Sequence, residues 1–129
     1  MSDRATEYLE LDDLVLLAAG LIGDPPPIRD LGLLGAAAAR PRATAFGVDA
    51  YTDAFTKAAA LLHSIVKNHA LIDGNKRLGW TACAVFLDLN GIDPTSASND
   101  DVFELVMRVA SSSIDAADLA EHLRSIVDV

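Results

Sequence analysis

Cysteine and basic residues are scarce in this sequence. The single cysteine, Cys83, cannot form a disulfide within the chain, which excludes a small scaffold held together by disulfides. Ten Lys and Arg stand against nineteen Asp and Glu, and the net charge is -9. Such a field repels nucleic-acid backbones and anionic membrane surfaces, so we expect neither nucleic acid nor membrane as a partner.

Long hydrophobic runs and a basic-then-apolar N-terminus are also missing. No apolar run reaches the length of a bilayer, and the first residues lack the order of a signal peptide. The chain of 129 residues is 51% hydrophobic, which suffices for one core of ordinary size. We therefore expect a soluble cytoplasmic protein with a single domain over residues 1–129.

Alternating strand patterns, repeats and low-complexity segments are absent, whereas helical periodicity is common. Apolar residues at spacings of three and four, together with capping signals, predict helices over Leu11–Ile22, Leu33–Arg40, Asp53–Asn68 and Asn75–Leu89, then two amphipathic helices that begin near Ser98 and Asp115. Arg42–Ala50 has no clear period and is predicted to be a mobile loop. The expected fold is an all-α bundle of about six helices, with Asn75–Leu89 central and buried.

The stretch from His69 to Arg77 combines residues suited to phosphate chemistry. It reads His-Ala-Leu-Ile-Asp-Gly-Asn-Lys-Arg and opens the helix at Asn75. A helix N-terminus offers free N–H groups and partial positive charge to an anion. Lys76 and Arg77 oppose the helix dipole there, so a bound anion would explain their presence. The sequence has no Walker loop and no protein-kinase glycine loop, which points to this helix start as the phosphate site.

His69 and Asp73 suggest two further roles. His69 can accept and release a proton near neutral pH, as a general base must, and Asp73 could hold Mg²⁺. A structural interpretation stays open beside this one: His69 caps the preceding helix, Asp73 caps the next, and Lys76 with Arg77 is a solvated charge pair.

The stretch resembles the signature of the Fic/Doc family, HxFx(D/E/N)(G/A)N followed by Gly or Lys and then Arg. This sequence supplies H, D, G, N, K and R in register. The likeness extends to Arg29–Leu34, the Ala-rich run to Pro41, Ala58–Leu62 and Phe86–Gly91, and so covers nearly the whole chain. The resemblance implies the family's helical fold, with the active-site loop preceding a central buried helix.

The resemblance also implies a role for each residue of the motif. His69 would be the catalytic base, Asp73 would bind Mg²⁺, and Gly74, Asn75, Lys76 and Arg77 would bind the phosphate of ATP or another nucleoside triphosphate. Lys67 is a weaker candidate for nucleotide binding, because a Lys at a helix C-terminus has an ordinary structural explanation. His63, His122 and Cys83 are interpreted as structural.

Lys76 distinguishes two branches of the family. Fic enzymes, which transfer AMP, have Gly at this position, and Doc-type toxins have Lys, which accompanies phosphoryl transfer. The resemblance therefore implies a Doc-type toxin that phosphorylates a Ser or Thr hydroxyl of a translation factor, with elongation factor Tu as the acceptor. The partner it implies is an antitoxin whose disordered C-terminal segment folds on the toxin.

Two departures from the pattern keep alternatives open. Leu71 replaces the family's Phe, and Thr81 stands where Doc-like proteins often have Asn. AMP transfer by His69 is one alternative, and a catalytically inactive interaction module is another. The family's self-inhibiting motif, (S/T)xxxE(G/N), has only a partial counterpart in Thr6 and Glu10, so regulation by a separate chain is expected.

Overall fold

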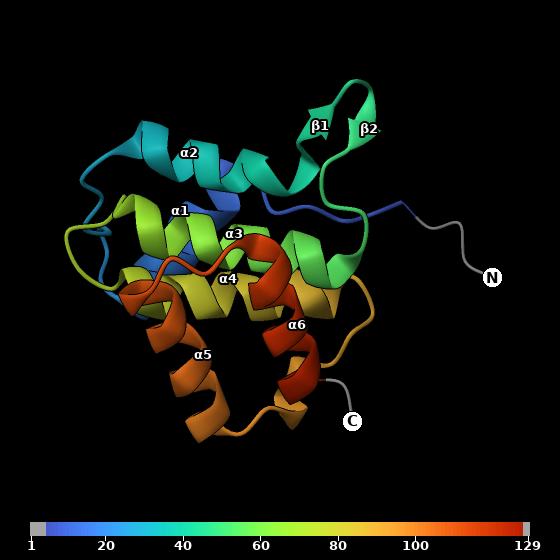
Figure 1. Ribbon diagram of the computed structural model, residues 1–129. Helices are drawn as coiled ribbons and strands as arrows, with labels where there is room; N and C mark the ends of the chain where they lie inside the picture. Colours follow the sequence, from blue (N-terminus) through green and yellow to red (C-terminus); the bar gives the residue numbers. More distant parts are fainter. Residues whose placement is uncertain (1–4, 128–129) are drawn as a thin grey trace.

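The computed structural model describes residues 5–127 and consists mainly of α-helices (Figure 1). In chain order the elements are α1 (Leu11–Leu21), α2 (Leu31–Ala39), the 3-10 turn η1 (Arg40–Arg42), β1 (Thr44–Ala45), β2 (Val48–Asp49), α3 (Ala54–Asn68), α4 (Asn75–Leu89), the 3-10 turn η2 (Pro94–Ser96), α5 (Asn99–Ser111) and α6 (Ala116–Val127). The predicted all-α bundle of six helices is confirmed. No helix in the described residues is long and apolar enough to cross a bilayer.

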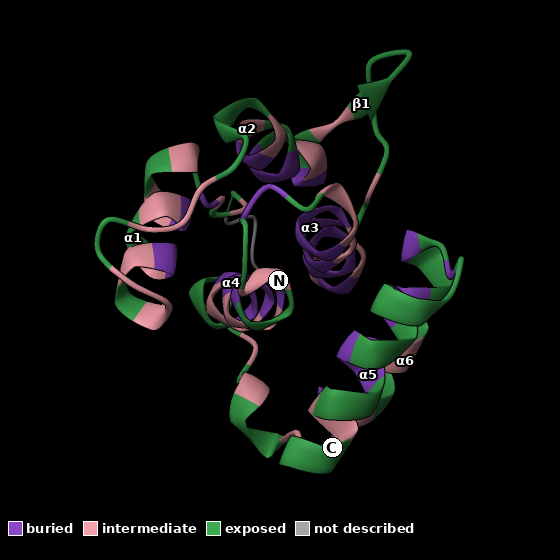
Figure 2. Cartoon of the chain, turned by 90° about the vertical axis from the view of Figure 1, so that its left-hand side faces the viewer, coloured by how far each residue is buried: buried purple, intermediate pink, exposed green. Residues whose placement is uncertain are grey.

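Helices α3 and α4 form the centre of the bundle. Figure 2 shows α3 surrounded by α2, α4, α5 and α6, with α1 packed on the other side of α4. Ten residues of α3 are buried, against six of α4. One hydrophobic core joins both helices with side chains from α1, α2, α5 and α6.

Gly79 lets α3 and α4 approach closely. A Cβ at this position would lie 2.8 Å from Cγ2 of Val66 and 3.1 Å from Cδ1 of Leu62. Any side chain there would push the two helices apart, and these helices carry the two ends of the motif loop. The small residue therefore helps to place His69 near the start of α4.

Side-chain caps define most helix starts. The Asp30, Asp53 and Ser98 side chains each accept a hydrogen bond from a first-turn N–H of α2, α3 and α5, respectively. The carboxylate of Asp115 accepts from the Asp118 N–H at 2.9 Å. The caps predicted at Ser98 and Asp115 are thus confirmed, and they satisfy donors that a helix leaves unpaired.

The segment between α2 and α3 differs from the sequence prediction. The sequence predicts a mobile loop over Arg42–Ala50, but β1 and β2 form a short antiparallel hairpin there, in which Thr44 pairs with Asp49 and Ala45 with Val48. Phe46 and Gly47 make the turn with φ of 55° and 79°. Two-residue turns of this kind usually show Asn-Gly or Asp-Gly, so Phe46-Gly47 gave no recognisable signal.

Candidate functional site

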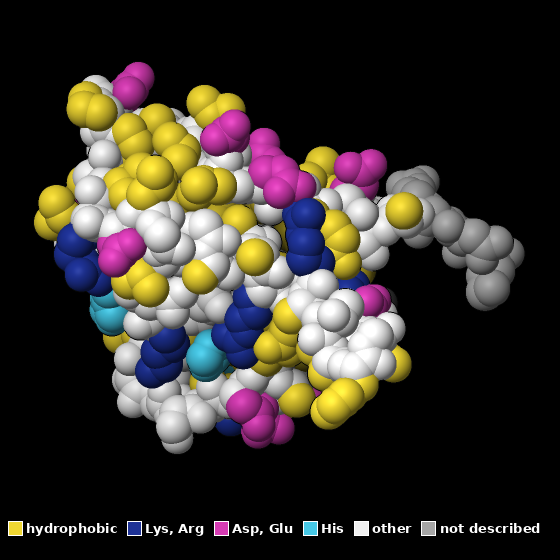
Figure 3. Space-filling view, turned by 90° about the horizontal axis from the view of Figure 1, so that it is seen from above, with side chains coloured by type: hydrophobic (Ala, Val, Ile, Leu, Met, Phe, Trp, Pro, Cys, Tyr) yellow, Lys and Arg dark blue, Asp and Glu magenta, His cyan; other side chains and the backbone are white. Residues whose placement is uncertain are grey.

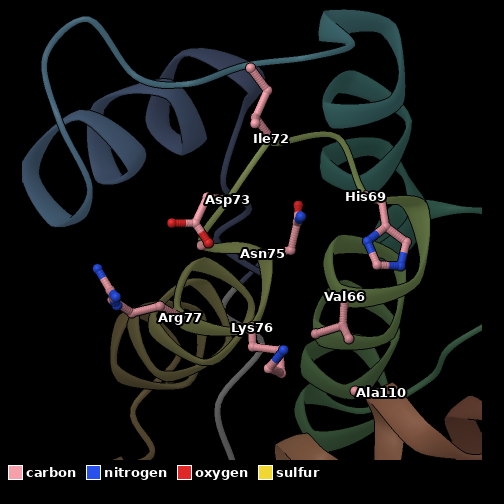
Figure 4. Close-up of a pocket in the computed structure, with 9 residues that line it drawn as sticks. Val66, His69, Ile72, Asp73, Asn75, Lys76, Arg77 and Ala110 are labelled. Atoms are coloured by element: carbon pink, nitrogen blue, oxygen red, sulfur yellow. The ribbon is translucent and has the colours of Figure 1, made fainter.

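The loop between α3 and α4 borders a pocket of about 470 Å³. Its lining includes six residues of the motif together with Val66 of α3, Ile72 of the loop and Ala110 of α5; the motif residues are His69, Asp73, Gly74, Asn75, Lys76 and Arg77. Figure 4 shows His69 and Lys76 on the α3 side of the pocket, and Asp73 and Arg77 on the α1 side. The fold therefore brings together every predicted site residue except Lys67.

His69 ends α3 in a left-handed conformation, with φ 52° and ψ 47°. A residue with a Cβ pays about 1 to 3 kcal/mol for this conformation, which persists when surrounding contacts determine it. The structural interpretation is right that His69 occupies the C-cap position of α3. However, its side chain is exposed and lines the pocket instead of packing in the core.

The start of α4 presents an unusually cationic helix end. Gly74 is the N-cap, with φ 89°, and within the described residues no side chain caps this helix. The alternative in which Asp73 caps α4 is therefore wrong. The first turn has no acidic residue, whereas Lys76 and Arg77 are both exposed there. Free N–H groups, the helix dipole and two cations together favour an anion at this end of the pocket.

Asn75 and Arg77 also hold the loop in shape. The Asn75 side chain accepts a hydrogen bond from the Leu71 N–H at 3.0 Å and donates one to the Leu71 carbonyl at 2.9 Å. The Arg77 guanidinium donates to the Leu21 carbonyl at the end of α1, at 3.2 Å. Leu71 is 2% exposed, so it fills the core as the family's Phe does, with a smaller side chain.

The segment just before α2 packs against the loop between α3 and α4 and forms backbone hydrogen bonds with it. Ile28 pairs with Leu71 in an isolated antiparallel bridge, and the Ile72 N–H donates to the Pro27 carbonyl at 2.8 Å. The Arg29 side chain contacts the carbonyl of His69. The sequence does not reveal Arg29 as part of the site, because its partner lies 40 positions away along the chain and leaves no periodic signal.

Lys67 lies outside the lining of the pocket. Its amino group donates to the Ser112 carbonyl at 2.7 Å and so ties the end of α3 to the segment before α6. This contact fits the structural explanation for Lys67 better than a nucleotide contact.

The remaining titratable candidates are held in structural positions. His63 lies 2.8 Å from the Arg40 guanidinium, and its pKa is lowered by burial and by that positive charge. Burial raises the pKa of the Cys83 thiol, so this side chain is unreactive. His122 lies 3.4 Å from the Arg108 guanidinium. None of the three lines the pocket at the motif.

An apolar groove of about 310 Å³ continues from the pocket between α4 and α5. Lys76 and Arg77 line both cavities, and the groove is otherwise bordered largely by apolar side chains of Trp80, Val102, Phe103, Val106 and Met107. Thr81 lies in this groove and not in the pocket. Phe103 is 65% exposed, although its side chain borders this apolar groove.

The described residues that line the pocket carry two cations, Lys76 and Arg77, and one carboxylate, Asp73. Although the net charge is -9, Figure 3 shows Lys, Arg and His side chains gathered over part of the face seen from above.

Glu10, the acidic residue of the partial self-inhibiting motif, pairs with Arg42 at 2.8 Å. It is thus engaged beside η1 and not at the motif loop.

Among the described residues that line the pocket, Asp73 is the only one with a carboxylate. Within residues 5–127 no three His, Cys, Asp or Glu side chains gather into a metal-binding group. Mg²⁺ commonly uses one or two carboxylates and completes its shell with water and substrate phosphates. A single exposed carboxylate beside the cationic start of α4 is therefore compatible with Mg²⁺ that takes its other ligands from water and a bound phosphate compound.

Comparison with known proteins supports the resemblance seen in the motif. A family model described as the Fic/DOC family matches residues 6–87. A protein named Toxin Doc from Mycolicibacterium smegmatis is 44% identical over 119 residues, which cover 92% of this chain and 92% of that protein. The similarity thus spans the motif loop and the helices on both sides of it.

Proposed function

The chain belongs to the Fic/DOC family, and on that basis we propose that it is a Doc-type toxin that transfers the γ-phosphate of a nucleoside triphosphate to a Ser or Thr hydroxyl of a protein. The observation that carries this proposal is the position of Lys76. It stands in the first turn of α4, in one pocket with His69 and the cationic helix end. A Lys there fills space that Gly would leave to a second phosphate group.

His69 acts as the general base in this proposal. It takes the proton from the acceptor hydroxyl, whose oxygen forms a bond to the γ-phosphorus while the bond to the bridging oxygen breaks and the nucleoside diphosphate leaves. The first-turn N–H groups of α4, Lys76 and Arg77 hold the transferred phosphate and stabilise its charge. A general base contributes on the order of 10² to 10⁴ in rate, and alignment and electrostatics supply the remainder.

Asp73 would hold Mg²⁺ when the nucleotide is bound. The ion would neutralise phosphate oxygens, which reduces the charge that the protein itself must balance. The side chain is exposed and beside the cationic helix end, so it can reach a nucleotide that enters from solvent.

The apolar groove next to the pocket suits the proposed antitoxin segment. It shares Lys76 and Arg77 with the pocket, so a chain lying in the groove would also cover two of the residues proposed to bind the phosphate. An amphipathic helix that folds on binding would cover the exposed side chains of Phe103 and Met107. The acceptor we propose is elongation factor Tu, in line with the family resemblance.

Labelled nucleotides test the proposed reaction. A translation extract is incubated with the protein and ATP carrying the label on either the α- or the γ-phosphate, and modified proteins are identified by mass spectrometry. We expect γ-label and a phosphate adduct on elongation factor Tu. An AMP adduct would identify the chain as a Fic-type adenylyltransferase, and no adduct from a protein that still binds a partner would favour the inactive interaction module.

A further inference from the structure

We propose that Arg29 is a positioning residue for His69, a role that rests on the proposed function of His69 as general base. Arg29 lies just before α2, and its guanidinium reaches the C-terminus of α3. Its Nε donates to the His69 carbonyl at 2.9 Å, and Nη2 donates to the same carbonyl and to that of Asn68 at 3.5 Å. The planar guanidinium thus directs two nitrogen donors at the C-terminus of α3, which fixes the orientation of these carbonyls better than a single donor would.

These contacts act on the strained residue itself. The orientation of the His69 carbonyl is set by ψ of His69, so a fork that fixes the carbonyl also fixes the left-handed backbone from which the imidazole projects. The backbone supports the same geometry, because the N–H groups of Arg29 and Asp30 donate to the Ala70 carbonyl at 2.8 and 3.0 Å. The two carbonyls that follow the strained Cα are therefore both held by the segment at Arg29.

Arg29 does not belong to the phosphate site. It is absent from the lining of the pocket, and its guanidinium contacts the carbonyls of Asn68 and His69 at the end of α3. Within residues 5–127, no carboxylate lies within ion-pair distance of its guanidinium. Its donors are thus directed to the end of α3, where the helix dipole favours a cation. Loss of Arg29 should disturb the base and leave nucleotide binding intact.

Arg29→Gln tests this role, with Arg42→Gln as the matched control. Arg42 is also exposed, but it pairs with Glu10 beside η1, away from the motif loop. We expect Arg29→Gln to lower kcat by about 10- to 100-fold with KM for ATP unchanged, because small displacements of a catalytic group have effects of this size. Arg29→Lys should fall between wild type and Arg29→Gln, and Arg42→Gln should match wild type.

A double-mutant cycle separates positioning from a general loss of stability. If Arg29 works through His69, Arg29→Gln should cause no further loss in a His69→Asn background. The proposal would be overturned if Arg29→Gln lowered kcat by the same factor in the His69→Asn background as in wild type. It would also be overturned if Arg29→Gln raised KM for ATP and left kcat unchanged. Rates are compared at a temperature where unfolding curves show every variant fully folded.

Nuclear magnetic resonance gives a readout that does not depend on activity. A residue with positive φ shows a strong nuclear Overhauser effect between its own amide hydrogen and Hα, and we expect this signal for His69 in wild type and in Arg42→Gln. It should weaken in Arg29→Gln. An unchanged signal in Arg29→Gln would refute the positioning role, whereas a changed signal in a protein that transfers no phosphate would refute only the proposed function.

Discussion

The side chain of Asn75 closes a ring with the backbone of Leu71, accepting from its N–H at 3.0 Å and donating to its carbonyl at 2.9 Å. Asn75, the first residue of α4, thereby holds Leu71, whose buried side chain anchors the loop in the core. Leu71 is buried, so its backbone groups depend on this side chain for partners. The loop is thus anchored at its base while His69 and Asp73 stay exposed.

Asn75→Ala should therefore lower the free energy of unfolding by about 1 to 3 kcal/mol, since it leaves a buried donor and acceptor unpaired. Asn99→Ala is the control, because Asn99 is the first residue of α5 and is exposed. That variant should stay within about 0.5 kcal/mol of wild type. Urea unfolding measures both, and equal losses would show that the ring with Leu71 contributes little.

Gly74→Ala should destabilise the protein by about 1 to 2 kcal/mol, because φ is positive at this position. A Cβ would also lie 2.3 Å from Cδ1 of Ile22, which must move. Gly20→Ala is the opposite case, because Gly20 lies in α1 and an added Cβ would have nothing within 4 Å. This substitution should stabilise the protein by about 0.5 kcal/mol. Thermal and urea unfolding that gave both variants the same sign would contradict this account.

The sequence predicted the helices and most of the pocket, because periodicity, caps and the motif are local signals. The bounds of α4 and the caps at Ser98 and Asp115 agree with the structure. The hairpin was missed because Phe46-Gly47 is not a usual turn pair. Arg29 was missed as part of the site because its partners, the carbonyls of Asn68 and His69, are backbone groups that sequence does not reveal.

The stability of the fold should depend on the protonation of His63. The pKa of His63 is lowered from 6.5, first by burial and then by the positive charges of Arg40 and Lys67. A hydrogen bond with the Ile114 backbone and the negative charge of Asp115 act in the opposite direction and raise this pKa. The unfolded chain therefore binds a proton first as pH falls, so stability is full above pH 6.5 and decreases below it.

Urea unfolding between about pH 7 and pH 5 measures this effect. His63→Gln should flatten the dependence of unfolding free energy on pH, because Gln can accept from Arg40 but does not titrate in this range. His122→Gln should leave the dependence as in wild type. A slope that survives in His63→Gln would assign the effect to another group.

His69→Asn should strongly reduce phosphate transfer while preserving the fold. Asn tolerates the left-handed conformation better than most residues, so this change removes the base with less backbone strain than Ala would introduce. We expect activity to fall by on the order of 10² to 10⁴ and the growth arrest on induction without antitoxin to disappear. Continued arrest by a folded His69→Asn protein would mean that toxicity comes from binding alone.

Lys76→Gly should convert the motif loop toward the form that Fic enzymes have. Lys76 is exposed at the junction of the pocket and the apolar groove, so Gly would remove both bulk and charge where the phosphates are proposed to bind. We expect a large loss of γ-phosphate transfer and weak AMP transfer, since contacts to base and ribose outside the motif also orient the nucleotide.

Lys76→Met separates the effect of bulk from the effect of charge, because it keeps the bulk and removes the charge. This variant should lose γ-phosphate transfer without gaining AMP transfer. Transfer from α- and γ-labelled ATP to the acceptor measures both reactions, and full γ-phosphate transfer by Lys76→Gly would show that Lys76 does not select the reaction.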